Sequence, residues 1–203
     1  MLTLYGNPHS GSTNKVRYLL EYFSIPYTFK ELDFEKDLKT PEYLKIHPAG
    51  KVPAINDDGF MLFESSAICK YLSVKMNNLL YPKDLKGRAL IDQWIDFTTI
   101  HLGGAVYKVV WNRLFAPQMK MPVSEEETKK GLQELERYLP LIDEKLKKGP
   151  YLAGSVLSLA DINLLATLEY ADMAKISLTK YKALVSWRKK LQAMDFYQRI
   201  HPK

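Results

Sequence analysis

The pattern of apolar and polar residues changes once along the chain, from short runs typical of strands to long helical periods. Residues 2–5 predict a strand, and the polar loop at residues 6–13 leads into apolar positions at helical spacing. Residues 26–32 alternate as a second strand, and the helix between the two strands is long enough for a right-handed crossover. A short helix is expected over residues 39–46.

A β-hairpin followed by a helix is predicted for the stretch from His47 to Ser66, HPAGKVPAINDDGFMLFESS. An Asp58-Gly59 pair between two apolar runs is a strong hairpin signal. Proline has no N–H group to donate within a sheet, so it is confined to strand starts, edges and bulges, and Pro53 fits the start of the first hairpin strand. A helix is expected over residues 64–75. The resulting order, β-α-β-α-β-β-α, is that of a thioredoxin-like fold.

The second half of the chain shows only helical periods. Residues 77–86 break the preceding periodicity and predict a linker between a thioredoxin-like domain at residues 1–76 and an all-helical domain at residues 87–203. The fold class is therefore α/β plus all-α. The first long helix should weaken or bend at Gly103-Gly104.

One helix start in the second domain carries a capping-box pattern. In S-L-A-D, Ser158 at the N-cap and Asp161 three residues later can satisfy each other's end N–H groups. This pattern predicts a structural role, and the replacement Asp161→Ala should cost on the order of 1 kcal/mol of stability through the lost cap.

Composition narrows the class of protein. A length of 203 residues with 46% apolar residues allows a packed core, and no apolar run of about eighteen residues is present, so a cytoplasmic protein without a membrane span is expected. Cys69 is the only cysteine, which excludes an internal disulfide and argues against a metal site. The net charge of +6 lies partly in lysine-rich helix ends, so nucleic-acid binding is not expected.

Two motifs in the predicted hairpin resemble a known family. K-V-P-A-I followed by L-F-E-S-S-A-I resembles the glutathione-binding half of the cytosolic glutathione transferases, in which a Val-Pro pair with a cis bond and a Glu/Gln-Ser pair hold the tripeptide. Y-L-A-G followed by S-L-A-D-I resembles the capped core helix of the helical domain in the same family. The resemblance therefore covers nearly the whole chain and implies a cis bond before Pro53.

The family activates the thiol of glutathione, and this chain offers several hydroxyl donors near its first helix. A free thiol is only about 3% ionised at pH 7. The loop sequence N-P-H-S-G-S-T-N-K-V resembles the phi pattern H-P-x-S-x-x-T-R-x-V. The theta pattern also has its Ser six residues before the Val. Both resemblances imply that Ser10 is the donor. Ser12 is the runner-up from the zeta pattern, and Tyr5 is the donor position in other classes. The usual Arg after the Thr is replaced by Asn14.

The resemblance also implies partners for the rest of the tripeptide. Lys39 and Lys51 would hold the glycyl carboxylate, and the backbone of Val52 would pair with the cysteinyl unit. Glu64 suits the α-ammonium group of the γ-glutamyl end, and Ser65 suits its carboxylate. Lys51 stands where phi enzymes usually have Gln.

The second substrate is expected to be a small hydrophobic electrophile, as in detoxification. Tyr107, Trp111 and Phe115 recur every four residues on one helix face and would form its site, with His9 contributed by the first loop. Glutathione is expected as co-substrate, with no permanently bound cofactor and no metal. The family implies a homodimer in which the first domain meets the second domain of the partner.

Two alternatives remain open at this point. One is a zeta-type, glutathione-dependent isomerase resembling maleylacetoacetate isomerase, although Glu-Ser replaces the expected Gln-Ser and the S-x-C motif is missing. The other is a non-catalytic binding or scaffold protein that keeps only the fold. The presence of Lys39, Lys51, Glu64 and Ser65 argues against the scaffold, because a scaffold has no need of partners for peptide ends.

Overall fold

The chain folds into two compact units in the computed structural model, which describes residues 1–77 and 79–202. The first unit comprises residues 1–81 and the chain from Ala193 onward, and the second comprises residues 82–192. The change of unit falls inside the predicted linker, of which residue 78 lies outside the described residues. The structure differs from the predicted division at the C-terminal segment, which was expected to belong to the helical domain.

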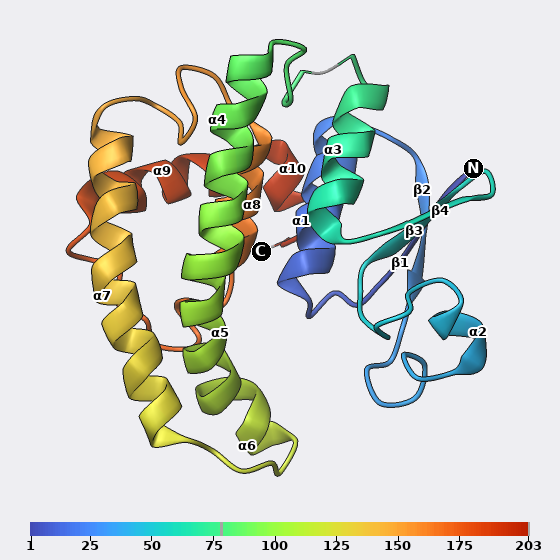
Figure 1. Cartoon of the computed structure of the whole chain (residues 1–203), viewed down its shortest axis with the longest axis horizontal. Coiled ribbons are helices and arrows are strands. Elements are labelled where there is room, and N and C mark those ends of the chain that lie inside the picture. Colours follow the sequence, from blue (N-terminus) through green and yellow to red (C-terminus); the bar gives the residue numbers. More distant parts are fainter. Residues whose placement is uncertain (78, 203) are drawn as a thin grey trace. The chain divides into compact units, whose positions relative to one another are not determined.

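The first unit is built on a four-stranded sheet with the order β2-β1-β3-β4 (Figure 1). β1 and β2 are parallel, whereas β3 is antiparallel to β1 and to β4. This arrangement confirms the thioredoxin-like fold. The elements of this unit are β1 (Leu2–Gly6), α1 (Gly11–Tyr22), β2 (Tyr27–Glu31), α2 (Pro41–Leu44), β3 (Ala54–Asp57), β4 (Phe60–Phe63), α3 (Ser65–Lys75) and α10 (Asp195–Gln198).

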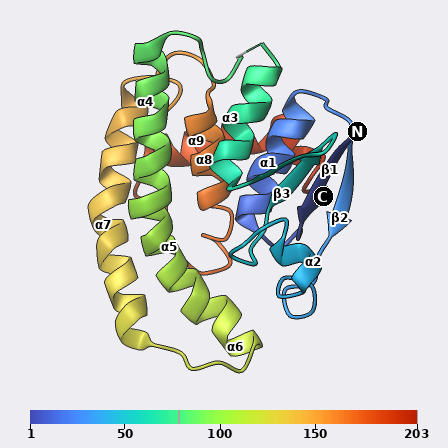
Figure 2. The same ribbon diagram turned by 45° about the vertical axis from the view of Figure 1, so that its right-hand side comes forward.

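Helices cover both faces of this sheet. α1 and α3 lie side by side on one face and α2 lies on the other (Figures 1 and 2). Alternation along β1 buries Leu2, Leu4 and Gly6, and the place of a Cβ on Gly6 is occupied by Thr13 of α1. The intervening Tyr5 packs instead with the cluster that includes Leu38 and Tyr43 of the α2 side.

The turn between β3 and β4 has the backbone that its sequence predicts. Asp58 and Gly59 both have positive φ, 51° and 94°, as a tight type I′ turn requires. The amide of Gly59 donates to the side-chain oxygen of Asn56 at 2.7 Å. This turn sets the register in which Asp57 pairs with Phe60, and so fixes where β4 ends and α3 begins.

The C-terminal segment belongs to the first unit because it packs on α1. The ring of Tyr18, which is fully buried, lies 5.9 Å from that of Phe196 and 5.4 Å from that of Tyr197. Its hydroxyl is 2.8 Å from Nε2 of His201. These contacts join residues nearly two hundred positions apart, which a local sequence pattern does not reveal.

The second unit is all-helical. Residues 85–118 are continuously helical and contain two π-helical segments. The first of these ends just before Gly103, where the helix was expected to weaken or bend. The elements of this unit are α4 (Leu85–Asp96), η1 (Phe97–Leu102), α5 (Gly103–Val110), η2 (Trp111–Phe115), α6 (Ala116–Gln118), α7 (Glu125–Lys147), α8 (Leu159–Thr167) and α9 (Lys182–Gln192).

The core of the second unit is α8, of which the residues from Leu159 to Ala166 are buried. The predicted capping box is present: the amide and hydroxyl of Ser158 both donate to Oδ2 of Asp161, at 3.0 and 2.9 Å. Asp161 has further partners beyond its own helix, since the amide of Leu152 and Nε1 of Trp187 donate to its other oxygen. The cap thus also joins α8 to α9.

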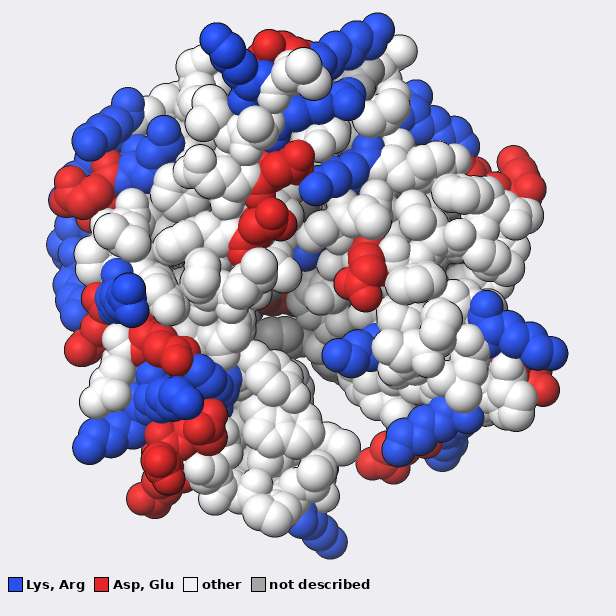
Figure 3. Space-filling model, in the orientation of Figure 1, with Lys and Arg blue, Asp and Glu red and all other residues white. Residues whose placement is uncertain are grey.

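The surface carries both signs of charge. On the face in Figure 3, lysine and arginine side chains lie among aspartate and glutamate side chains rather than in one continuous basic patch. Within the described residues, no helix combines the length and the apolar character that crossing a membrane requires.

Candidate glutathione site

The loop between β1 and α1 is held by side-chain amides. Asn7 is buried; its Nδ2 donates to the carbonyl of Leu32 at 2.8 Å, and its Oδ1 accepts from the amide of His9 at 2.9 Å. At the far side of the loop, Nδ2 of Asn14 donates to the carbonyl of Pro8 at 2.9 Å. Asn14, the departure from the phi pattern, therefore supports the donor loop.

Ser10 is the N-cap of α1. Its Oγ accepts a hydrogen bond of 3.3 Å from the amide of Thr13, so its hydroxyl hydrogen remains to be donated elsewhere. The N-terminal N–H groups of the helix add a positive partial charge at this point. A thiolate placed here would receive a hydroxyl hydrogen bond and the favourable end of a helix dipole.

The other candidate hydroxyls have different surroundings. Ser12 is exposed within the first turn of α1. Thr13 is fully buried, where its Oγ1 accepts from the amide of Asn7 at 3.3 Å and its methyl group lies against Gly6. The ring of Tyr5 lies on the α2 face of the sheet, 6.4 Å from that of Tyr43, while the α1 start is on the opposite face.

The backbone from Gly50 to Pro53 is in contact with the α2 side of the unit. The Val52–Pro53 bond is cis. The hydroxyl of Tyr43 donates to the carbonyl of Lys51 at 2.6 Å, which ties this segment to α2. Gly50, with φ of 57°, has no room for a side chain because a Cβ would lie 2.7 Å from the carbonyl oxygen of Leu38.

That close approach brings together the two backbone segments that carry Lys39 and Lys51. Lys39 follows Leu38 and Lys51 follows Gly50, and both lysine side chains are exposed. Two cations beside one ordered backbone segment suit a carboxylate.

The start of α3 is the most unusual backbone of the site. Glu64, the N-cap residue, has φ of 69° and ψ of 109°, in a region that residues other than glycine rarely occupy. Its side chain is exposed and makes no capping hydrogen bond. Local strain of this kind occurs where a side chain must be held in a fixed position for a ligand.

Ser65, the next residue, is the first of α3 and is partly buried. Its Oγ accepts a hydrogen bond of 3.1 Å from Nζ of Lys15 on α1. The site therefore includes a buried lysine that the motif comparison did not single out. Its signal lay in the helical period, since Lys15 is four residues before Leu19 on the buried side of α1.

The residues predicted for the electrophile site divide between the two units. His9 is exposed in the loop of the first unit. In the second unit, the exposed ring of Tyr107 stacks on Trp111 with a centroid distance of 5.8 Å. The ring of Phe115 meets that of Tyr170 edge to face at 5.6 Å. That these rings bind one substrate stays a prediction.

Comparisons with known proteins decide the family. The model of the glutathione S-transferase N-terminal domain matches residues 1–74, and that of the C-terminal domain matches residues 106–195. The chain belongs to the glutathione S-transferase family. The two matches correspond to the sheet-containing unit and to most of the helical unit.

Individual members indicate the class. The chain is 31% identical over 205 residues to the probable glutathione S-transferase GSTF2 of Oryza sativa subsp. japonica, with 98% of this chain and 95% of that protein covered. Glutathione transferase F2 from Populus trichocarpa is 28% identical and superimposes with a TM-score of 0.92 over 99% of this chain and 97% of its own. This chain therefore belongs to the phi/theta-like class of the family.

Two further similarities bear on ligands and on alternatives. The theta class glutathione S-transferase from Xanthomonas axonopodis pv. citri, solved with glutathione bound, is 28% identical and has a TM-score of 0.89, with 100% of this chain and 97% of that chain covered. Elongation factor 1-gamma of Prunus avium is 35% identical over 162 residues, which cover 76% of this chain and 37% of that protein.

Proposed function

We propose that this glutathione transferase joins the thiolate of glutathione to small hydrophobic electrophiles, and that Ser10 activates the thiol. The observation that carries the proposal is the strained start of α3, where an exposed Glu64 with positive φ precedes Ser65. A family member that serves only as a scaffold has no need of this strain. The glutathione bound to the theta class neighbour supports the same ligand here.

Ser10 would act by stabilising the ionised form of the thiol. A shift of the thiol pKa by roughly two units multiplies the thiolate at pH 7 more than twentyfold and requires about 2.7 kcal/mol of selective stabilisation. A hydroxyl hydrogen bond to a charged acceptor contributes about 1.5–3 kcal/mol. The hydroxyl hydrogen of Ser10, which the contact with Thr13 leaves available, together with the start of α1, is sufficient for this shift.

The ends of the tripeptide would find complementary charges. Glu64 binds the α-ammonium group, Ser65 binds the neighbouring carboxylate, and Lys39 and Lys51 bind the glycyl carboxylate. The backbone of Val52 pairs with the cysteinyl unit. The bond from Tyr43 to Lys51 supports this assignment because it holds the backbone beside Val52.

The electrophile would bind to aromatic side chains of the helical unit. The stacked, exposed pair of Tyr107 and Trp111 offers an apolar surface, to which Phe115 and His9 are added as predicted partners. We add to this proposal the cytoplasmic location expected from the sequence.

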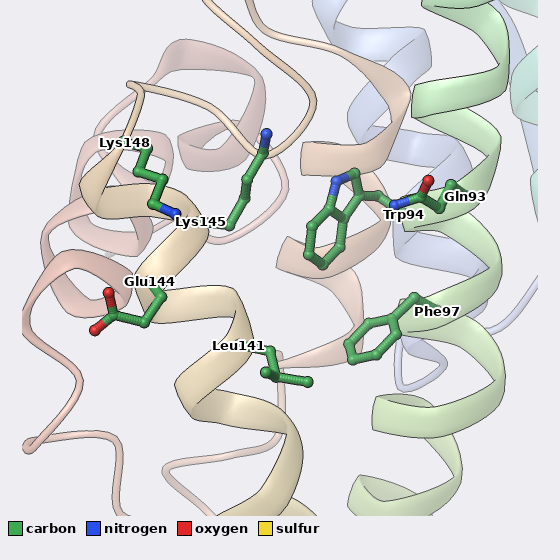
Figure 4. Close-up of a pocket in the computed structure, with 7 residues that line it drawn as sticks. All are labelled: Gln93, Trp94, Phe97, Leu141, Glu144, Lys145 and Lys148. Carbon is green, nitrogen blue, oxygen red and sulfur yellow. The ribbon is translucent and has the colours of Figure 1, made fainter.

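We also propose that the protein is a homodimer in which the first unit of one copy meets the second unit of the other. β4 exposes three large apolar side chains, Phe60 on the α3 face of the sheet and Met61 and Phe63 on the other face. In the helical unit, a groove of about 410 Å³ lies between α4 and α7, and Trp94 and Leu141 point into it (Figure 4). Apolar side chains rimmed by polar ones, here Gln93, Glu144, Lys145 and Lys148 around the groove, mark interfaces.

Sedimentation of the wild type and of Phe60→Glu tests the dimer. A dimeric wild type and a monomeric variant support the proposed interface. A monomeric wild type contradicts it.

The scaffold reading has one specific observation in its favour, the similarity to elongation factor 1-gamma. Two matches of nearly full length to glutathione transferases outweigh it, since the elongation factor is covered over only 37% of its length. The similarity to the rice glutathione S-transferase GSTF2 likewise favours glutathione transfer over zeta-type isomerisation as the reaction of this protein.

The experiment combines calorimetry with a conjugation assay. Wild type should bind glutathione, and Glu64→Ala should lose at least about tenfold in affinity. Ser10→Ala should still bind but lose about a hundredfold in kcat/KM for a generic aryl halide, as when one donor to a developing anion is removed.

Ser12→Ala is the matched control, because it deletes a hydroxyl of the same helix turn. Loss of conjugation in Ser12→Ala rather than in Ser10→Ala would transfer the role of donor to Ser12. A wild type that fails to bind glutathione would leave only the fold, and the scaffold reading would replace the proposal.

A further inference from the structure

Lys15 is a buried cation to which the proposed mechanism gives no role. Only 7% of its surface is exposed, and its Nζ donates hydrogen bonds to Oγ of Ser65 at 3.1 Å and to Oγ of Ser66 at 3.4 Å. Burial lowers the pKa of Lys15, while the nearby thiol of Cys69 and the carboxylate of Glu64 act in the opposite direction. The two hydrogen bonds place Nζ of Lys15 beneath the start of α3.

Stability does not explain a lysine at this position. Among the described residues, no carboxylate lies within ion-pair distance of Nζ of Lys15. The hydrogen-bond partners of Nζ are the two neutral hydroxyls of Ser65 and Ser66. Removing an ion from water is costly, and a protein with an apolar side chain of similar volume in its place is often as stable or more stable. A charge retained under these conditions indicates a role in binding.

The contact with Lys15 sets the direction of the Ser65 hydroxyl. An ammonium group has donors and no acceptor, so Oγ of Ser65 accepts, and its own hydrogen is left to donate elsewhere. Ser65 is only partly buried, and the Glu64 side chain does not cap the first N–H groups of α3. A hydroxyl donor, uncapped N–H groups and a positive charge behind them all favour a carboxylate.

We propose that Lys15 is a positioning residue for the α-carboxylate of the γ-glutamyl end of glutathione. It holds Ser65 so that the hydroxyl donates to the ligand, and it places a positive charge behind that carboxylate, where no carboxylate of the described chain forms an ion pair with it. The inference rests on the proposed glutathione site and adds to it a residue that acts through Ser65.

The test uses two ligands that differ in one carboxylate. These are glutathione and the analogue in which 4-aminobutyrate replaces the γ-glutamyl residue, which keeps the amine and the thiol. Calorimetry on wild type and Lys15→Met gives both dissociation constants. We expect Lys15→Met to weaken glutathione binding about tenfold and to change the affinity for the analogue by less than about twofold.

The melting temperature separates this role from a structural one. Because Lys15→Met removes a buried charge, the variant should melt at the wild-type temperature or above it. Lys75→Met is the matched control, since Lys75 pairs with Asp57 at 2.5 Å in the same unit. It should lower the melting temperature and leave the preference for glutathione over the analogue unchanged.

A double-mutant cycle tests the route through Ser65. Ser65→Ala should remove most of the preference for glutathione, and adding Lys15→Met to Ser65→Ala should weaken binding by much less than it does in the wild type. Independent, additive losses overturn the route through Ser65.

Each remaining outcome is decisive. Equal weakening of both ligands by Lys15→Met, unchanged glutathione affinity, or a variant that does not fold overturns the inference and leaves the proposed function standing. A wild type that binds neither ligand overturns the proposed function itself.

Discussion

The hydroxyl of Tyr43 donates a hydrogen bond of 2.6 Å to the backbone carbonyl of Lys51. Burial, aided by the nearby Tyr5, raises the pKa of Tyr43 to about 12, so the hydroxyl keeps its hydrogen at neutral pH. The short helix α2 is thereby joined to the backbone next to Val52. Tyr43 thus helps to hold the segment proposed to bind the cysteinyl unit.

Tyr43→Phe should weaken both folding and binding. The lost hydrogen bond leaves the carbonyl of Lys51 without this donor, which costs about 1 kcal/mol of stability, and glutathione affinity should fall about threefold to tenfold. Thermal unfolding and calorimetry measure the two effects. Tyr22→Phe, at a partly exposed position of the same unit, should change neither, and glutathione affinity unaffected by Tyr43→Phe would contradict the supporting role.

Asp161 has a larger structural role than its capping pattern predicts. It is fully buried and accepts four hydrogen bonds, from the amide and hydroxyl of Ser158, the amide of Leu152 and Nε1 of Trp187. Asp161→Ala should therefore cost about 3–5 kcal/mol, rather than the roughly 1 kcal/mol of a lost cap. Chemical denaturation measures the difference.

Asp84→Ala is the matched control for Asp161→Ala. Asp84 is an exposed N-cap of α4 whose side chain bonds the amide of Gly87, so its loss should cost only about 1 kcal/mol. Equal costs for the two variants would show that the contacts of Asp161 outside its cap contribute little.

Asp57 should make folding sensitive to acid. Hydrogen bonds from Lys75 and Tyr71, at 2.5 and 2.6 Å, hold the pKa of Asp57 below its ordinary value. A lowered folded-state pKa stabilises the protein above the unfolded-state pKa of about 4, and this contribution is lost as pH falls through the folded-state pKa. It should amount to about 1 kcal/mol, since Lys75 is half exposed.

Melting temperatures of wild type and Asp57→Asn between pH 2 and pH 7 check this dependence. The variant should be less stable at neutral pH, and the two curves should approach each other in acid. Parallel curves over the whole range would exclude Asp57 as a source of the pH dependence.

Two helical glycines should respond in opposite directions to the same replacement. A Cβ on Gly131 of α7 would lie 2.8 Å from the carbonyl oxygen of Ala105 and 2.9 Å from Val109, so Gly131→Ala forces α5 and α7 apart. We expect a loss of about 1–3 kcal/mol. Gly104 in α5 has open space, and Gly104→Ala should gain up to about 1 kcal/mol from helix propensity. Unfolding curves that rank the variants in the reverse order would contradict this packing.

Local patterns allowed several turns and helix starts to be predicted. The Asp58-Gly59 turn, the helix start at Glu64 and the Ser158 cap each depend on a few neighbouring residues, and each occurs in the structure as expected. The cis bond before Pro53 followed from the family resemblance.

Long-range packing decided the features that the sequence did not predict. The C-terminal segment joins the first unit because Phe196 and Tyr197 meet Tyr18, a pairing with no local signature. The buried place of Lys15 is visible in the helical period alone, but its contact with Ser65 depends on how α1 packs against α3.

Ser10 is proposed to lower the pKa of the bound glutathione thiol. An ultraviolet absorbance titration of the thiolate in the enzyme–glutathione complex measures that pKa directly, in wild type and in Ser10→Ala. We predict a wild-type midpoint about two units below the reference value near 8.5, and a return toward that value in Ser10→Ala. A lowered midpoint that is the same in both proteins, or an ordinary midpoint in the wild type, would contradict this role of Ser10.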